Sequence, residues 1–159
     1  MKKHKLFLKN TFHNIKIFFY KKIFLYFMKK IINYSVHLSI AWLIIIFVLS
    51  SFPIPNLNIP DFWDRVNIDK LGHSLFYFIL TFFLFIYFFS QKKSIFLKKN
   101  AFSISMIISI SFGGIMEVLQ EFIFTHRFGD FIDFFANAFG TFCLLFFVKK
   151  IAKMKDLNK

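Results

Sequence analysis

Polar side chains that can bind a ligand or move a proton fall in three short groups of this sequence. Carboxylates and an imidazole transfer protons near neutral pH, and Lys and Arg bind phosphate oxygens, so the set suits recognition of, or chemistry on, a charged head group. No nucleophile with an adjacent base stands among them. The candidate pocket residues are Asp69, Lys70, His73, Tyr77, Glu117, Gln120, Arg127, Asp130, Asp133 and Asn137.

The spacing within the groups fits single faces of helices. Asp130, Asp133, Asn137 and Gly140 recur at helical intervals and therefore share one stripe. The other two groups show the same kind of periodicity. The candidate pocket residues are thus expected to lie on helices, and those helices must pack together for the three groups to form one site.

Four apolar stretches are long enough to supply such helices as membrane spans. They cover residues 34–52, 69–89, 101–124 and 130–148, and about 20 apolar residues are needed to cross a bilayer. The composition of 57% hydrophobic residues, with 29 Phe in 159 positions, excludes an ordinary soluble domain. We therefore predict an all-α membrane protein with a four-transmembrane-helix bundle.

Two basic segments flank the predicted transmembrane domain of residues 34–148. Residues 1–33 mix Lys with aromatic and aliphatic side chains, which predicts a basic amphipathic N-terminal arm lying on anionic lipid. Residues 149–159 form a basic cytoplasmic tail. Met28 offers an alternative start, in which residues 1–27 are not part of the protein.

Charge sorts the connections between the spans into two kinds. The N-terminal arm, residues 91–100 and the tail carry an excess of Lys, whereas residues 61–133 outside that basic connection contain seven acidic residues and only three basic ones. Because positive loops stay on the cytoplasmic side, both termini are expected to be cytoplasmic and the polar groups to face outward. The net charge of +13 is then explained by the membrane topology, and no nucleic-acid partner is expected.

Depth in the membrane limits where the polar side chains point. Glu117 precedes the end of its span by seven residues, and Asn137 follows the start of the next by seven, so both lie roughly 10 Å below the boundary. A carboxylate facing lipid there costs on the order of 2.5–3.5 kcal/mol, so we expect Glu117 to face the bundle and meet Asn137. Gly113, Gly114 and Gly140 allow close helix packing beside this site.

The remaining charges are expected to pair across helices. Lys70 or Arg127 should balance Asp130 and Asp133 near the outer ends of the spans. No metal site or cofactor is expected, because neither an HExxH motif nor Cys/His ligand spacing occurs. An alternative is that these polar groups only hold the helices together.

The polar residues form three motifs in a fixed order along residues 34–148. The motifs are Asp69-Lys70-x-x-His73, Glu117-x-x-Gln120 and Arg127-x-x-Asp130-x-x-Asp133-x-x-x-Asn137-x-x-Gly140. This ordered set resembles the VanZ-like membrane protein family. The resemblance implies a small multi-pass protein of the bacterial cytoplasmic (inner) membrane, associated with the cell envelope. The family takes its name from a protein linked to antibiotic resistance of the teicoplanin type.

Two functions of different classes fit these residues. In the first, an outward-facing polar pocket binds an anionic envelope lipid or precursor, such as a polyprenyl phosphate, through Lys70 and Arg127. In the alternative, the chain is a membrane-embedded enzyme acting on lipid-linked phosphates, with Glu117 as acid or base and Asp69 and His73 as a proton shuttle.

Overall fold

A computed structural model of the chain describes residues 2–52, 68–124, 129–148 and 151. Within these residues the regular secondary structure is helical and no strand occurs, which confirms the all-α prediction. Packing divides the chain into two units, Met1–Tyr34 and Ser35–Lys159. All of the candidate pocket residues belong to the second unit.

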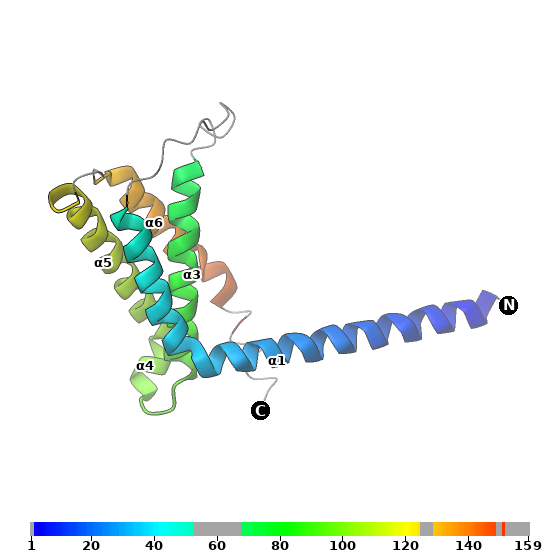
Figure 1. The fold of residues 1–159 in the computed structure, drawn as a ribbon. Coiled ribbons are helices and arrows are strands. Elements are labelled where there is room, and N and C mark those ends of the chain that lie inside the picture. The colour runs from blue at the N-terminus through cyan, green and yellow to red at the C-terminus, as the bar shows by residue number, and fades with distance from the viewer. Residues whose placement is uncertain (1, 53–67, 125–128, 149–150, 152–159) are drawn as a thin grey trace. The chain divides into compact units, whose positions relative to one another are not determined.

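The order of the helices follows the apolar stretches of the sequence (Figure 1). Within the described residues, four helical segments are long and apolar enough to cross a membrane: 22–51, 68–90, 101–122 and 131–148. This result confirms the prediction of four such segments. The helices are α1 (Lys2–Ser51), α3 (Ile68–Ser90), α4 (Ile95–Lys99), α5 (Ala101–Phe122) and α6 (Phe131–Cys143).

The first helix covers both of the predicted N-terminal parts. We expected an amphipathic arm over residues 1–33 and a span over residues 34–52, and α1 runs through both from Lys2 to Ser51, while packing divides the chain between Tyr34 and Ser35. No Pro or Gly occurs between Lys2 and Ser51, so the backbone has no local reason to leave the helix. The helix ends just before Pro53, which disfavours helical geometry in the preceding residue.

A short helix interrupts the basic connection between α3 and α5, where we predicted only a loop. α4 begins after Ser94, whose Oγ accepts a hydrogen bond from the Leu97 N–H at 3.3 Å. The Ser94 N–H in turn donates to Gln91 Oε1 at 2.9 Å. Serine is among the preferred residues at a helix N-cap, so the sequence carried the signal for this element.

The second unit packs around α3, which contacts both α5 and α6. Its core contains Tyr77 and Leu80 of α3 together with Ile46 of α1. Trp42 of α1 donates its indole N–H to the Phe76 carbonyl at 2.9 Å, which satisfies the polar atom of a largely apolar ring. The core thereby fixes α3 as the central helix, and its first turns present Asp69, Lys70 and His73.

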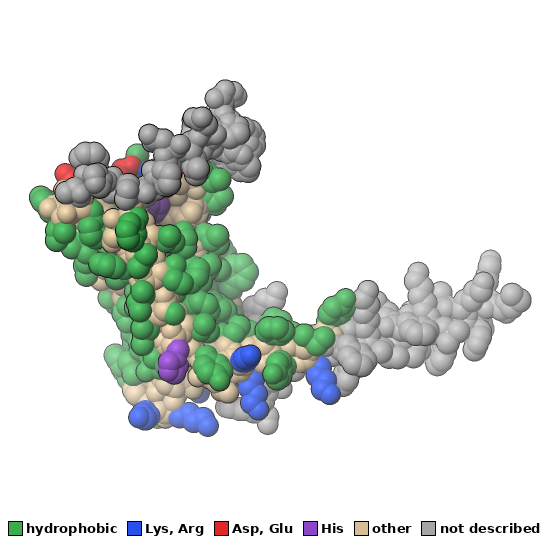
Figure 2. Space-filling view, viewed as in Figure 1, with side chains coloured by type: hydrophobic (Ala, Val, Ile, Leu, Met, Phe, Trp, Pro, Cys, Tyr) green, Lys and Arg blue, Asp and Glu red, His purple; other side chains and the backbone are tan. Residues whose placement is uncertain are grey.

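Large apolar side chains remain exposed along the helices. Phe131, Phe146 and Phe122 are 83%, 82% and 80% exposed, and hydrophobic side chains cover most of the helical surface seen in Figure 2. Soluble monomers rarely expose contiguous apolar patches of this kind. Exposed apolar helix surfaces of membrane-spanning length are compatible with a multi-pass membrane protein.

Helix α6 meets the backbone of α3 at Gly140. A Cβ added to Gly140 would lie 1.9 Å from the Ser74 carbonyl oxygen, so a larger residue requires the helices to separate. Ser74 Oγ also donates to the Ala136 carbonyl at 3.0 Å. This contact determines how closely the polar residues of α3 and α6 approach one another.

Gly140→Ala is expected to lower the free energy of unfolding by about 1–3 kcal/mol, because the added methyl group displaces backbone atoms. Gly72→Ala in α3 is the matched control, since nothing lies within 4 Å of a Cβ added there, and Ala favours a helix over Gly by roughly 0.5–1 kcal/mol. Thermal unfolding of the purified protein in detergent, followed by circular dichroism, compares the two variants. Unchanged or increased stability of the Gly140 variant would contradict this helix contact.

Candidate ligand-binding site

Three helix ends meet at one end of the second unit. α3 and α6 begin there and α5 ends there (Figure 1). Asp130 caps α6, and its Oδ1 accepts the Ile132 N–H at 2.8 Å. Asp69 lies in the first turn of α3 and Asp133 in the first turn of α6. Free backbone N–H groups and the helix dipole stabilise carboxylates at such positions.

Lys70 of α3 joins the two helix N-termini electrostatically. Its Nζ donates to Asp130 Oδ2 at 3.0 Å and also to Asp133 Oδ1, and it lies 3.8 Å from Asp69 Oδ2. The Lys70 side chain is 27% exposed and that of Asp133 is 13% exposed, so water screens this pair less than a surface pair. We predicted that either Lys70 or Arg127 would pair with Asp130 and Asp133, and Lys70 makes both contacts. Arg127 lies outside the described residues.

A chain of hydrogen bonds continues from His73 through the centre of the bundle. His73 Nδ1 lies 3.1 Å from Asn137 Oδ1, and Asn137 Nδ2 donates to Glu117 Oε1 at 3.1 Å. Glu117 Oε2 accepts the Asp130 N–H at 3.1 Å. Since Asn137 is 1% exposed, both ends of its amide are satisfied by protein partners, and the chain links α3, α5 and α6.

These contacts define a connected group that we call the polar cluster. Two of the predicted pocket residues do not take part in its hydrogen bonds or ion pairs. Tyr77 is 2% exposed and lies in the core of the unit. Gln120 donates to the Ser50 carbonyl of α1 at 3.2 Å and so joins α5 to α1. The polar cluster consists of Asp69, Lys70, His73, Glu117, Asp130, Asp133 and Asn137.

A second polar contact deeper in the bundle was missed by the sequence analysis. Thr81 Oγ1 donates to Ser109 Oγ at 2.9 Å, and Ser109 Oγ lies 3.1 Å from Thr141 Oγ1. All three residues are fully buried and come from α3, α5 and α6. Thr141 follows Asn137 by four residues on the same face of α6, which was the available signal.

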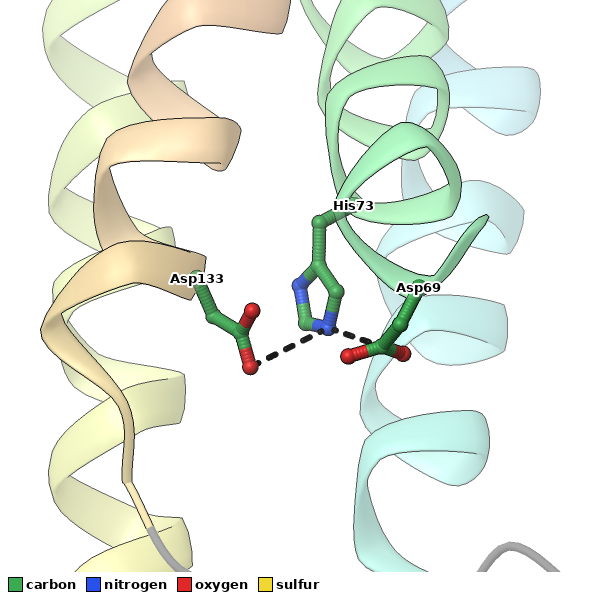
Figure 3. A group of neighbouring side chains, drawn as sticks. All are labelled: Asp69, His73 and Asp133. Atoms are coloured by element: carbon green, nitrogen blue, oxygen red, sulfur yellow. Dashed lines mark ion pairs between the residues drawn. The ribbon is translucent and has the colours of Figure 1, made fainter. Parts of the chain in front are cut away.

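An imidazole and two carboxylates converge within the polar cluster, as Figure 3 shows. His73 Nε2 lies 3.8 Å from Asp69 Oδ1 and 3.7 Å from Asp133 Oδ2. These distances exceed the range of a hydrogen bond. The candidate ligand atoms of the three residues nevertheless lie within 4.8 Å of one another, close enough to share a metal ion. The sequence analysis expected no metal site, because these residues follow no sequence motif for one.

A largely apolar groove of about 520 Å³ adjoins the polar cluster. α5 forms one wall, and the first turns of α6 form the other. Three carboxylates lie among its apolar side chains, and two of them, Glu117 and Asp130, belong to the polar cluster. The lining residues are Gly114, Glu117, Val118, Glu121, Phe122, Gly129, Asp130, Phe131 and Phe134.

Glycines shape this groove and the contact behind it. A Cβ added to Gly129 would lie 2.6 Å from the Glu117 carbonyl oxygen, so glycine lets the chain before α6 approach α5. The Gly129 N–H donates to Glu121 Oε2 at 3.1 Å. Gly114 borders the Phe134 ring, and Gly113 lies against Tyr77 and Asn137. Of the predicted packing glycines, Gly114 lies on a wall of the groove, Gly113 lies beside Asn137, and Gly140 meets the backbone of α3 at Ser74.

Comparison with known proteins gives this chain no relatives from which to infer a function. It matches no family model, no curated protein and no solved structure. The function must therefore be inferred from the geometry and electrostatics of the polar cluster and the groove.

Asn137→Leu is expected to lower the free energy of unfolding, because it leaves the His73 imidazole and the Glu117 carboxylate without their shared partner. Each buried polar group that loses its hydrogen bond costs about 1–3 kcal/mol. Ser103→Leu adds the same side chain at an exposed position of α5 and serves as the control. If thermal unfolding in detergent gives equal stabilities for the two variants, the hydrogen-bond chain does not hold the helices together.

Asp130 should make the stability of the fold depend on pH in the acid range. The Ile132 N–H, followed by Lys70, holds the pKa of Asp130 below its ordinary value. A carboxyl with a lowered folded-state pKa stabilises the fold above its unfolded pKa, and this contribution disappears as the pH falls through the folded pKa.

Asp130→Asn tests this dependence, because Asn is an equally good N-cap but carries no charge. The difference in melting temperature between the wild type and the variant should be largest at neutral pH and should decrease below about pH 4. A difference that stays constant from neutral to acid pH would show that the Asp130 charge contributes nothing.

Proposed function

We propose that this chain is a VanZ-like protein of the bacterial cytoplasmic membrane that binds an anionic envelope lipid or lipid-linked precursor. The lipid chain occupies the apolar groove, and the head group lies at the polar cluster. The observation that carries the proposal is that Glu117 and Asp130 belong to both features. A largely apolar site with a few fixed polar groups at one end suits an amphiphile.

The polar cluster offers both donors and acceptors to a head group. Lys70 has three N–H donors, and Asp130 and Asp133 each accept one of them. Among the described residues Lys70 has no further hydrogen-bond acceptor, so its third donor can bind a phosphate oxygen, and the carboxylates can accept hydrogen bonds from sugar or glycerol hydroxyls. Arg127, which precedes Asp130 by three residues, is proposed as the second phosphate partner.

The distribution of charge supports an outward-facing cluster. Residues 91–100 contain four Lys and no acidic residue, and they connect α3 to α5 at the end of these helices away from the polar cluster. Positive connections remain cytoplasmic. The polar cluster is therefore proposed to lie at the outer leaflet, with both termini of the chain inside the cell.

The geometry gives less support to the alternative of an enzyme acting on lipid-linked phosphates. Both oxygens of Glu117 accept hydrogen bonds from the protein, so this carboxylate is held as an acceptor. Among the described residues, no hydroxyl or thiol forms a hydrogen bond with His73. A binder fits better than a nucleophilic enzyme, and a link to teicoplanin-type resistance would follow from binding an envelope precursor.

Lipid binding is tested with the full chain in nanodiscs and a fluorescent polyprenyl phosphate. Gly114→Leu fills the groove and should weaken binding at least tenfold, or about 1.4 kcal/mol, whereas the exposed Ser103→Leu should leave it unchanged. Equal affinities of both variants and the wild type would contradict the groove. Turnover of the lipid that Glu117→Gln abolishes would instead establish the enzyme.

The proposed topology is tested by cysteine labelling in cells, after Cys143→Ser removes the single native cysteine. Asn58→Cys should react with an impermeant maleimide in intact cells, since residue 58 belongs to an acidic connection. Ile95→Cys lies in the basic connection, where it is 76% exposed in the wild type, and should react only after permeabilisation. The opposite labelling pattern would overturn the topology.

A further inference from the structure

The hydrogen bonds of the polar cluster determine which nitrogen of His73 carries the proton. A carboxylate only accepts hydrogen bonds, so the contact with Glu117 assigns the NH₂ group of Asn137 to that side. Asn137 Oδ1 then faces His73 Nδ1 and accepts its N–H. The neutral imidazole therefore carries its proton on Nδ1, and Nε2 presents a lone pair to Asp69 and Asp133.

The two aspartates divide their oxygens between Lys70 and His73. On Asp133, Oδ1 accepts from Lys70 and Oδ2 faces His73 Nε2. On Asp69, Oδ2 is nearer Lys70 and Oδ1 faces Nε2. In the part of the chain that the structure describes, no N–H or O–H group donates to Asp69 Oδ1, Asp133 Oδ2 or His73 Nε2. Three electron-pair donors thus converge, an arrangement that a bound cation would stabilise.

We propose that Asp69, His73 and Asp133 bind a divalent transition-metal ion, for which Zn²⁺ is the best match. Imidazole nitrogen and carboxylate oxygen are both Zn²⁺ ligands at about 2.0–2.2 Å. Two ligands of one such ion at a tetrahedral or wider angle are separated by about 3.4–3.8 Å, and the two carboxylate oxygens lie 3.8 and 3.7 Å from Nε2 in the structure. The Asn137 contact to Nδ1 is the outer hydrogen bond that a ligating histidine normally makes.

Charge balance favours a divalent ion over a proton at this position. Asp69, Glu117, Asp130 and Asp133 carry four negative charges against the single positive charge of Lys70. A divalent ion removes two of the three excess charges, whereas protonation of His73 removes one. Three protein ligands leave a fourth position on the ion for water or an oxygen of a ligand. That this oxygen belongs to a lipid phosphate rests on the proposed function, but binding of the metal does not.

The metal is tested on the full chain, purified in detergent with an affinity tag free of histidine and stripped with EDTA. After equilibrium dialysis against micromolar Zn²⁺ with millimolar Mg²⁺ as competitor, elemental analysis should find about one Zn²⁺ per wild-type chain. Asp133→Asn and His73→Gln should weaken Zn²⁺ binding at least tenfold. X-ray absorption of the loaded wild type should show nitrogen and oxygen neighbours that include one imidazole, and no sulfur.

Matched variants distinguish the loss of a Zn²⁺ ligand from the loss of a negative charge and from a change in folding. Asp130→Asn removes the same charge as Asp133→Asn in the same region, and His37→Gln removes a histidine from α1, so both should retain Zn²⁺. Wild-type protein that binds no Zn²⁺, or Asp130→Asn that loses it as fully as Asp133→Asn, would overturn the proposal. Because no lipid is present in this assay, its outcome is independent of lipid binding in nanodiscs.

Discussion

The orientation of one buried amide, that of Asn137, determines the arrangement of the polar cluster. An amide has a donor end and an acceptor end, and burial denies both of them water. Glu117 of α5 accepts from one end and His73 of α3 donates to the other, so the three helices are held at one relative depth and rotation. A buried polar group without such partners is destabilising, which is why this constraint is strong despite the modest energy of each bond.

The close packing of the helices makes that network geometrically possible. Gly140 lets α6 touch the backbone of α3, and Gly113 makes room beside Asn137 and Tyr77. The carboxylates of Asp69, Asp130 and Asp133 are stabilised locally by helix N-termini, and their excess of negative charge is only partly balanced by Lys70. The end of the bundle therefore carries excess negative charge, which the proposed metal ion would balance before an anionic head group binds, and it adjoins a largely apolar groove.

The sequence predicted much of the fold because membrane spans are specified by length and hydropathy. Apolar runs located α3, α5 and α6 within a few residues, and the periodicity of Asp130, Asp133 and Asn137 placed them on one face. Periodicity does not say which helix that face meets. Gln120 was therefore assigned to the pocket although it contacts α1, and the convergence of His73 with Asp133 could not be read from residues 60 positions apart. A continuous helix through residue 34 was not predicted, because a change in charge pattern does not end a helix that lacks Pro and Gly, whereas packing does divide the chain between Tyr34 and Ser35.

The protonation state of His73 tests the central claim most directly, because the Asn137 amide can select one nitrogen only if the network is formed. Nitrogen-15 NMR of histidine-labelled protein in nanodiscs at neutral pH, with the His73 signals assigned from a His73→Gln sample, reports which ring nitrogen carries the proton. The account predicts a proton on Nδ1 and none on Nε2. A neutral imidazole with its proton on Nε2 would contradict it.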